Sequence, residues 1–180
     1  MTLVILDRDG VINYDSDQYI KSPAEWKPLP GSIEAIALLT HSGYRIAVAS
    51  NQSGIGRGLF DMATLNAMND KMMEMVFRAG GRIDALFFCP HTDAEKCNCR
   101  KPKTGMFEEI AARMHTELKG VPCVGDALRD LQAAEAVGGQ PILVLTGKGR
   151  KTKEEGELPR KALVFADLAE VARHLLSARE

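Results

Sequence analysis

The sequence predicts a doubly wound α/β fold, with a mainly parallel sheet and helices on both of its faces. Six short apolar runs alternate with segments of helical spacing. Most of these runs are continuous rather than alternating, as expected for strands that are buried on both sides. The chain has 180 residues, of which 45% are hydrophobic and 26% charged, the size and composition of one ordinary globular domain. We therefore expect a single domain that spans residues 1–180 and has right-handed crossovers.

The predicted strands and helices follow one another along the chain. The strands are residues 3–6, 45–49, 85–89, 122–125, 141–146 and 163–166. Helices are expected to begin at four capping residues, Ser32, Asp61, Thr104 and Asp167. The first helix would end before Gly43 and the third before Gly120, and Glu170 would complete a capping box in the last.

Charge and composition exclude several classes of protein. The chain has 23 basic and 24 acidic side chains, so no net field attracts nucleic acid or a membrane surface. No apolar stretch is long enough to span a bilayer, and Asp7 comes too early for a secretory signal. We expect a cytoplasmic protein whose four cysteines are reduced, so that a cysteine cluster would hold a metal rather than form disulfides.

Two segments interrupt the regular alternation. Residues 13–30 and 90–103 are too long for simple turns, and long loops at the carboxyl ends of strands are usually functional. The basic residues 148–153 are predicted to form a solvated surface turn, with anion binding as the alternative.

Two carboxylates, Asp7 and Asp9, follow directly on the apolar run 3–6. Charge at the edge of an apolar core is costly unless something pairs with it, and ligands bind at the carboxyl ends of strands in open parallel sheets. The pair indicates a divalent-cation site beside a nucleophile, with a simple acidic turn as the alternative. Asp126 also follows a predicted strand and could be a third oxygen ligand for Mg²⁺, unless it and Asp130 only cap the next helix.

Two further segments suit an anionic substrate. Residues 50–58 (SNQSGIGRG) follow the second predicted strand, and their hydroxyl, amide and glycine groups can direct N–H donors at a phosphate. Arg100 and Lys101 would place fixed cations opposite the paired carboxylates. The alternatives are a plain loop for the first segment and a surface basic pair for the second.

Three cysteines and one histidine lie close together in the sequence, at C-x-H and C-x-C spacing. They are Cys89, His91, Cys97 and Cys99, a set that matches a tetrahedral Cys₃His zinc site. Because all four positions would be filled by protein, we expect a structural Zn²⁺ that holds the loop about 89–103, which carries Arg100 and Lys101. Cys123 lies within a predicted strand and is expected to be a core thiol.

Together these residues make the chain resemble the haloacid dehalogenase superfamily, whose four motifs lie at strand ends in this order. Asp7 and Asp9 match the first motif, Ser50 the second, Lys101 the third and Asp126 the fourth. The chain is more closely similar to the heptose bisphosphate phosphatase family, in which DRDGxIN, (T/S)NQSGIxRG, CPH…CxCRKP and VGDxxxD segments occur. The resemblance covers almost the whole sequence, and it implies a Rossmann-like domain with a zinc loop and no large cap domain.

The resemblance implies a role for each matching residue. Asp7 would be the nucleophile that accepts the phosphoryl group, and Asp9 would protonate the leaving sugar oxygen and then activate water. Mg²⁺ would be held by Asp7, Asp126 and the backbone carbonyl of Asp9. The transferring phosphoryl oxygens would be held by Ser50, Asn51 and Lys101. The residues implied in substrate recognition are Arg100, Gln52, Ser53 and the segment from Asp15 to Tyr19.

The activity implied by this resemblance is Mg²⁺-dependent hydrolysis of the C7 phosphate of D-glycero-D-manno-heptose 1,7-bisphosphate through an aspartyl-phosphate, in the synthesis of ADP- or GDP-heptose precursors. We expect a monomer that acts on this small sugar phosphate and has no nucleic-acid or membrane partner. Histidinol-phosphate phosphatases share the first motif and the zinc loop and are the nearest alternative. A phospho-accepting receiver domain and a non-catalytic zinc-binding module are alternatives of other classes.

Overall fold

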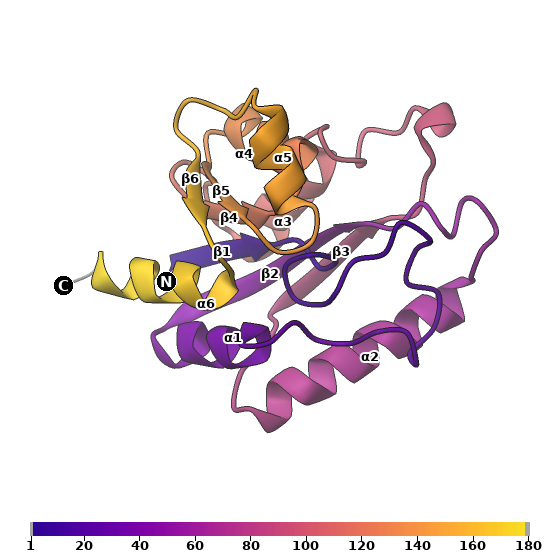
Figure 1. Ribbon diagram of the computed structural model, residues 1–180, viewed down its shortest axis with the longest axis horizontal. Coiled ribbons are helices and arrows are strands. Elements are labelled where there is room, and N and C mark those ends of the chain that lie inside the picture. Colours follow the sequence, from indigo (N-terminus) through magenta and orange to yellow (C-terminus); the bar gives the residue numbers. More distant parts are fainter. Residues whose placement is uncertain (1, 179–180) are drawn as a thin grey trace.

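The computed structural model describes residues 2–178 and contains a six-stranded parallel sheet (Figure 1). The strands are β1 (Thr2–Leu6), β2 (Tyr44–Asn51), β3 (Ala85–Cys89), β4 (Pro122–Gly125), β5 (Gln140–Val144) and β6 (Leu163–Phe165). Their order across the sheet is β3-β2-β1-β4-β5-β6, and every neighbouring pair is parallel. The winding direction therefore reverses between β1 and β4, and the predicted doubly wound α/β class is confirmed.

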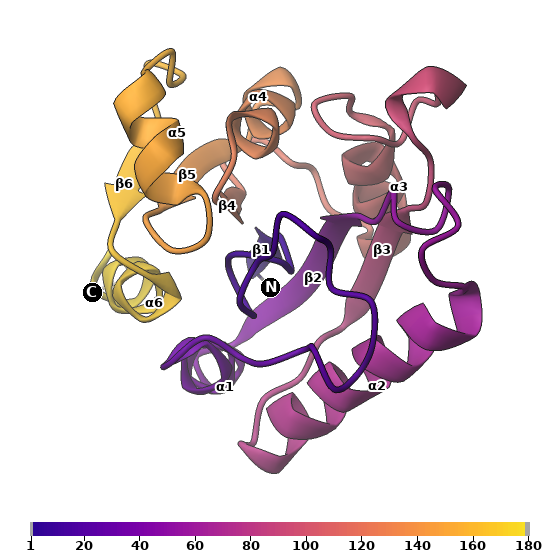
Figure 2. The ribbon, with the colours of Figure 1, turned by 45° about the vertical axis from the view of Figure 1, so that its right-hand side comes forward.

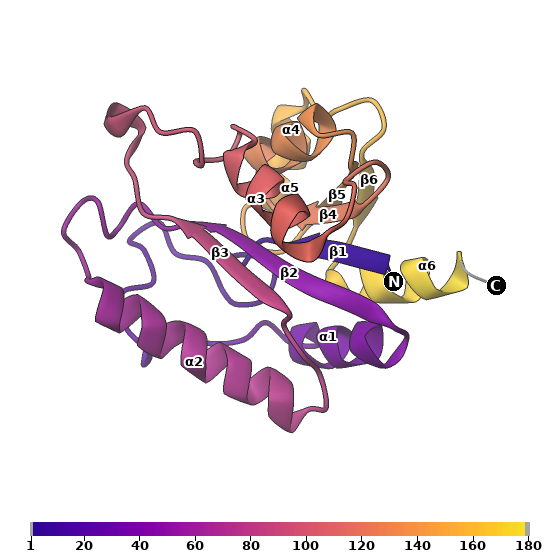
Figure 3. The ribbon, with the colours of Figure 1, turned by 180° about the vertical axis from the view of Figure 1, so that it is seen from behind.

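Helices cover both faces of this sheet (Figure 3). They are α1 (Ser32–His41), α2 (Met62–Arg78), α3 (Gly105–Met114), α4 (Leu128–Ala136), α5 (Gly149–Glu155) and α6 (Leu168–Ser177), with a short 3₁₀ helix, η1 (Asp93–Glu95). α1, α2 and α6 pack on one face, and α3 and α4 pack on the other. Over the described residues, no helix has the length and apolar character needed to cross a membrane.

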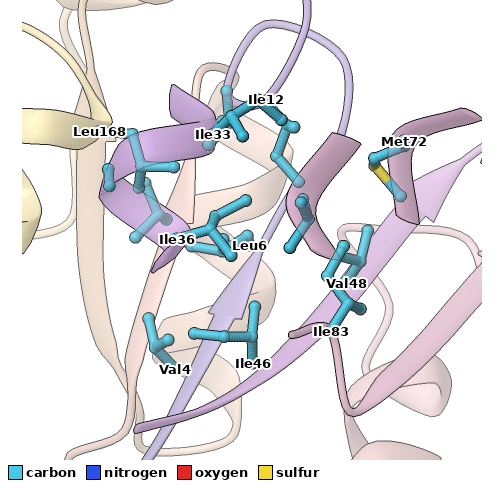
Figure 4. Packing of buried hydrophobic residues seen from close by; sticks show 14 of the residues in the cluster. Val4, Leu6, Ile12, Ile33, Ile36, Ile46, Val48, Met72, Ile83 and Leu168 are labelled. Atoms are coloured by element: carbon cyan, nitrogen blue, oxygen red, sulfur yellow. The ribbon is translucent and has the colours of Figure 1, made fainter. Parts of the chain in front are cut away.

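The central strand β1 shows why its apolar run is continuous. Val4 and Leu6 point into the core beneath α1, where Figure 4 shows Leu6 beside Ile36 and Val4 beside Ile46. Leu3 and Ile5 belong to the separate core under α3 and α4. Side chains of a strand alternate between its faces, so a strand that is covered on both sides is apolar at every position.

Two of the predicted helix caps are present. Asp61 accepts a hydrogen bond from the N–H of Thr64 (2.8 Å), and Asp167 accepts one from the N–H of Glu170 (2.9 Å). The carboxylate of Glu170 accepts from the N–H of Ala166 rather than from that of Asp167. The capping box at the start of α6 is therefore only half formed.

The first and third helices differ from the prediction at their ends. Ser32 does not cap α1 but lies inside it, because its hydroxyl donates to a carbonyl of the preceding loop (2.8 Å). Thr104 precedes α3, but its side chain makes no capping hydrogen bond. α3 ends at Met114, well before Gly120, because His115 adopts a left-handed backbone conformation (φ 48°).

The prediction of a surface turn at residues 148–153 is wrong, because most of this segment forms α5. The sequence of α5, GRKTKEE, contains no apolar side chain, so hydrophobic periodicity could not reveal it. Its stability comes from tertiary contacts instead. Thr152 is buried, and its hydroxyl donates to the backbone carbonyl of Asp126 (2.8 Å).

The long loop at residues 13–30 runs from β1 toward α2 and back to α1 (Figure 2). Trp26, in the middle of the loop, is fully buried in the core on that face of the sheet. Lys71 of α2 donates hydrogen bonds to the carbonyls of Pro23 and Trp26, both at 2.7 Å, and its ammonium lies 5.7 Å from the centroid of the indole. These contacts hold the loop against α2.

We predict that Trp26→Ala lowers the free energy of unfolding by about 3–5 kcal/mol, because it leaves a large cavity in the core. The matched control is Phe77→Ala on α2, where the aromatic side chain is 79% exposed. This control should change the free energy of unfolding by no more than about 0.5 kcal/mol. Urea denaturation followed by circular dichroism would measure both, and equal losses in the two variants would contradict the anchoring role of Trp26.

Candidate active site

The carboxyl ends of β1, β2 and β4 meet at one edge of the sheet, where the winding reverses and a ligand site is expected. A cavity of about 160 Å³ opens there. The predicted residues that line it are Asp7, Asp9, Asp15, Tyr19, Asn51, Gln52, Ser53, Arg100 and Asp126. Ser50 and Lys101 are buried beside them. The structure therefore gathers the predicted site residues from four separate segments of the chain.

The ammonium group of Lys101 lies between two carboxylates in the protein interior. Its Nζ is 3.1 Å from Oδ1 of Asp7 and 2.8 Å from Oδ1 of Asp130, and it donates to the carbonyl of Ala49 (2.7 Å). Burial would lower the pKa of Lys101, but the neighbouring carboxylates of Asp130 and Asp7 outweigh it and raise the pKa. Lys101 is therefore a fixed cation next to Asp7.

Three buried carboxylates, those of Asp7, Asp126 and Asp130, form a compact group in which one oxygen of each lies within 4.8 Å of the others. Burial is the largest influence on the first two, and the neighbouring carboxylates add to it. The pKa is raised to about 7 for Asp7 and to about 8 for Asp126. The pKa of Asp130 is lowered instead, because Lys101 and Arg129 outweigh its burial. Three carboxylates against the single ammonium of Lys101 leave an excess of negative charge in the group. Oxygen donors with an excess of negative charge fit a Mg²⁺ ion.

Close backbone packing holds Asp126 in this group. Gly10 has φ 85°, and a Cβ at this position would lie 2.0 Å from Oδ2 of Asp126, so only glycine fits after the D-x-D pair. The same oxygen accepts a hydrogen bond from the backbone N–H of Lys148 (2.8 Å), at the start of α5. The segment between β5 and α5 therefore orients a candidate metal ligand.

The carboxylate of Asp9 lies outside the group of three and is held by side-chain donors. Its oxygens accept from Nε of Arg8 (2.9 Å), Nδ2 of Asn13 (2.8 Å) and Nε2 of Gln52 (3.1 Å). Burial would raise the pKa of Asp9, but the charge of Arg8 and these hydrogen bonds outweigh it and lower the pKa. Asp9 is therefore ionised and fixed in orientation at the cavity wall.

The end of β2 connects the two sides of the site. Gln52 donates to the hydroxyl of buried Ser50 (2.7 Å) as well as to Asp9. Asn51 and Lys101 exchange hydrogen bonds: the Asn51 side-chain amide donates to the Lys101 carbonyl and the Lys101 N–H donates to the Asn51 side-chain oxygen, both at 3.1 Å. The loop that carries Lys101 is therefore fastened to β2.

The predicted recognition residues stand around the mouth of the cavity. Arg100 forms an ion pair with Asp93 of η1. Asp15 lies 3.5 Å from the ammonium of Lys148. Tyr19 has a left-handed backbone conformation (φ 65°) within the long loop. These side chains come from both long loops, as expected if the loops serve the site.

Sequence reasoning missed three charged side chains of the site, those of Asp130, Arg129 and Lys148. Asp130 pairs with Lys101, and Arg129 and Lys148 line the cavity. The four-residue spacing from Asp126 to Asp130 was a signal for the first, since it places both carboxylates on one side of a helix start. For Lys148 the signal was the basic run 148–153, for which anion binding was the alternative. No local signal marks Arg129, because its position depends on where α4 packs.

The four predicted zinc ligands form a second group, at the start of the long loop after β3. The Sγ atom of Cys89 lies 3.6 Å from that of Cys97 and 3.1 Å from that of Cys99. Nδ1 of His91 lies 3.5 Å from Cys89 Sγ and 3.3 Å from Cys99 Sγ. Tetrahedral Zn²⁺ with Zn–S bonds of about 2.3 Å places sulfur atoms about 3.8 Å apart. The Cys89–Cys97 separation is close to this value and the Cys89–Cys99 separation is shorter, and the donor set is one that zinc prefers.

Comparisons with known proteins agree with this geometry. A family model described as HAD-hydrolase-like matches residues 98–171. The chain is 56% identical over 176 residues to the D-glycero-beta-D-manno-heptose-1,7-bisphosphate 7-phosphatase of Bordetella bronchiseptica, covering 98% of both sequences. It is 53% identical over 176 residues to the phosphatase of the same name from Pseudomonas putida, covering 98% of this chain and 100% of that protein.

A solved structure of the B. bronchiseptica D,D-heptose 1,7-bisphosphate phosphatase, complexed with magnesium and phosphate, superposes with a TM-score of 0.97. It shares 55% sequence identity with this chain, and the match covers 99% of each. Identity of this degree over whole chains establishes common descent as well as a common fold. The chain therefore belongs to the haloacid dehalogenase superfamily and, within it, to the D-glycero-beta-D-manno-heptose-1,7-bisphosphate 7-phosphatase family.

Proposed function

We propose that this chain is a Mg²⁺-dependent phosphatase that removes the C7 phosphate from D-glycero-D-manno-heptose 1,7-bisphosphate, a step toward ADP- or GDP-heptose. The observation that carries the proposal is the buried contact of Lys101 with Asp7 in a chain 56% identical to a phosphatase of that name. The names of the relatives specify the β anomer, and we propose this anomer as the substrate. The same names favour the heptose over histidinol phosphate.

In the first step, a carboxylate oxygen of Asp7 attacks the phosphorus atom and the bond from phosphorus to the C7 oxygen breaks. Lys101 and the N–H of Arg8 both contact Oδ1 of Asp7, at 3.1 and 2.8 Å, and so fix the orientation of the nucleophile. Ser50 and Asn51, at the end of β2, are placed to donate to the phosphoryl oxygens. Positioning and charge stabilisation account for most of the catalysis of such transfers.

Asp9 supplies and then removes the proton. Its pKa is low in the free site, but an incoming phosphate brings negative charge close to it, and a like charge raises the pKa of a carboxylate. In this way Asp9 takes up the proton that it gives to the sugar oxygen as the C7 bond breaks. As a carboxylate again, it removes a proton from the water that hydrolyses the aspartyl-phosphate on Asp7.

The residues that would hold Mg²⁺ are Asp7, Asp126 and the backbone carbonyl of Asp9, with Asp130 closing the group of carboxylates. When bound, Mg²⁺ offsets the repulsion between Asp7 and the incoming phosphate. A structural Zn²⁺ would be held by the cluster at Cys89, His91, Cys97 and Cys99. The recognition residues would be Asp15, Tyr19, Gln52, Ser53 and Arg100, which line the cavity.

We further propose a single phosphatase domain over residues 1–180 that acts as a cytoplasmic monomer. Two observations support the domain and the compartment. The described strands share one sheet, and none of the four cysteines is in a disulfide within the described residues, as expected in a reducing compartment.

Phosphate release from candidate esters in the presence of Mg²⁺ tests the substrate. We expect kcat/KM for the β-heptose 1,7-bisphosphate to exceed that for histidinol phosphate by at least about a hundredfold, because a site built for one set of polar groups rejects an analogue that lacks them. The α-heptose bisphosphate provides the anomer control. Equal or better hydrolysis of histidinol phosphate would contradict the proposed function.

Replacing the nucleophile tests the mechanism. Asp7→Asn should lower kcat by at least about a thousandfold, because an amide oxygen is a far weaker nucleophile than a carboxylate. Asp70→Asn, on the exposed side of α2, makes the same chemical change away from the site and should leave kcat unchanged. Turnover of Asp7→Asn at the rate of Asp70→Asn would show that Asp7 is not the nucleophile.

Metal analysis tests the cysteine cluster. Wild-type protein should contain about one zinc ion per chain, and Cys97→Ser should lower this content sharply, because a hydroxyl is a poor zinc ligand. Cys123→Ser, which removes a buried thiol of β4 outside the cluster, should retain the metal. Elemental analysis by mass spectrometry gives the stoichiometry, and undiminished zinc in Cys97→Ser would refute the assignment.

A further inference from the structure

Arg129 is a charged residue of the cavity wall that the mechanism above does not use. It lies in the first turn of α4, next to Asp130, and it lines the cavity together with Asp7 and Asp126. Its Nε is buried and has no hydrogen-bond partner in the part of the chain that the structure describes. Within residues 2–178, no hydrogen bond or close ion pair joins its guanidinium to another side chain.

The other cations around the cavity already have partners. Lys101 is paired with Asp7 and Asp130, Arg100 with Asp93, and Lys148 with Asp15. A guanidinium carries five N–H donors, and a buried donor without an acceptor is costly. Arg100 is ion-paired through its Nε but leaves its buried Nη1 without an acceptor, whereas no donor of Arg129 is taken up within the described chain.

Arg129 keeps its charge in this position. Burial would lower its pKa, but the nearby carboxylates of Asp130, Asp7, Asp126 and Asp15 outweigh it and raise the pKa. The site therefore holds a permanent cation with free donors beside the nucleophile. The planar fork of a guanidinium matches the oxygens of a phosphate better than it matches any other group of a sugar phosphate.

We propose that Arg129 is a substrate-binding residue that donates its buried Nε–H to a phosphate oxygen of the sugar bisphosphate. The inference rests on the proposed function, since it assumes a phosphorylated sugar in the cavity. It adds to the site a cation that is supplied by α4 rather than by either long loop. The bisphosphate has two phosphates, and the two can be told apart by kinetics.

The test compares Arg129→Gln with Arg173→Gln, which changes an exposed arginine of α6. Both are assayed with heptose 1,7-bisphosphate and with heptose 7-phosphate. If Arg129 binds the C1 phosphate, Arg129→Gln raises KM for the bisphosphate about ten- to a hundredfold, and the kinetic constants for the monophosphate stay unchanged. If it binds the phosphate that is transferred, kcat/KM falls by that factor for both substrates. Arg129→Lys, which keeps the charge but lacks the fork, should show a smaller loss in the same constant.

Two results would overturn the inference. One is an Arg129→Gln variant whose kinetic constants lie within twofold of those of Arg173→Gln for both substrates. The other is a change in the Mg²⁺ dissociation constant alone, which would mean that Arg129 only screens the carboxylates. Thermal unfolding shows whether Arg129→Gln folds, and Arg129→Lys carries the test if it does not. If the wild type releases no phosphate from the bisphosphate, the proposed function fails rather than this inference.

Discussion

The geometry of the site depends on the buried ammonium of Lys101. It lies 3.1 Å from Asp7 and 2.8 Å from Asp130, and all three side chains are almost fully buried. A charge in the protein interior is tolerated only when partners of opposite charge replace the lost hydration, and removing one partner leaves the others uncompensated. This contact joins the end of β1, the start of α4 and the loop after β3, which are distant in the sequence. The nucleophile and its cation are thus parts of a single electrostatic unit.

The loop that carries Lys101 needs support of its own. Few of its side chains are apolar, and residues 92–96 at its tip are largely exposed. Two other features hold it: the cluster of thiols and His91 at its base, and the paired hydrogen bonds between Asn51 and Lys101. A metal bound by the cluster would fix the base of the loop. The zinc ligands would then position Lys101, although Lys101 does not bind the metal itself. The three carboxylates of Asp7, Asp126 and Asp130 need a cation rather than a metal-binding donor, because their negative charges outnumber the positive charges near them.

Much of this site follows from short stretches of sequence. Asp7 and Asp9 follow the continuous apolar run 3–6, so their location at the sheet edge needed no knowledge of the rest of the fold. The spacing of the three cysteines and His91 was likewise sufficient to predict a metal-binding cluster, since ligands so close in sequence can reach one ion. Local patterns failed where an element is stabilised by contacts rather than by periodicity. α5 has no apolar residue, Ser32 bonds to a loop instead of capping α1, and α3 stops at His115 rather than at the expected glycine.

The pattern of residues along the sequence was thus enough to predict the strands, the doubly wound class, the paired carboxylates and the metal-binding cluster. Packing in three dimensions was needed to bring Asp130 onto Lys101 and to place the backbone of Lys148 against Asp126. It also leaves the buried Nε of Arg129 without an acceptor among residues 2–178. The reason is physical. The periodicity of apolar residues and the spacing of metal ligands involve residues that are close in the sequence. The charge balance of a buried site depends instead on every charged group that the fold brings within a few ångströms.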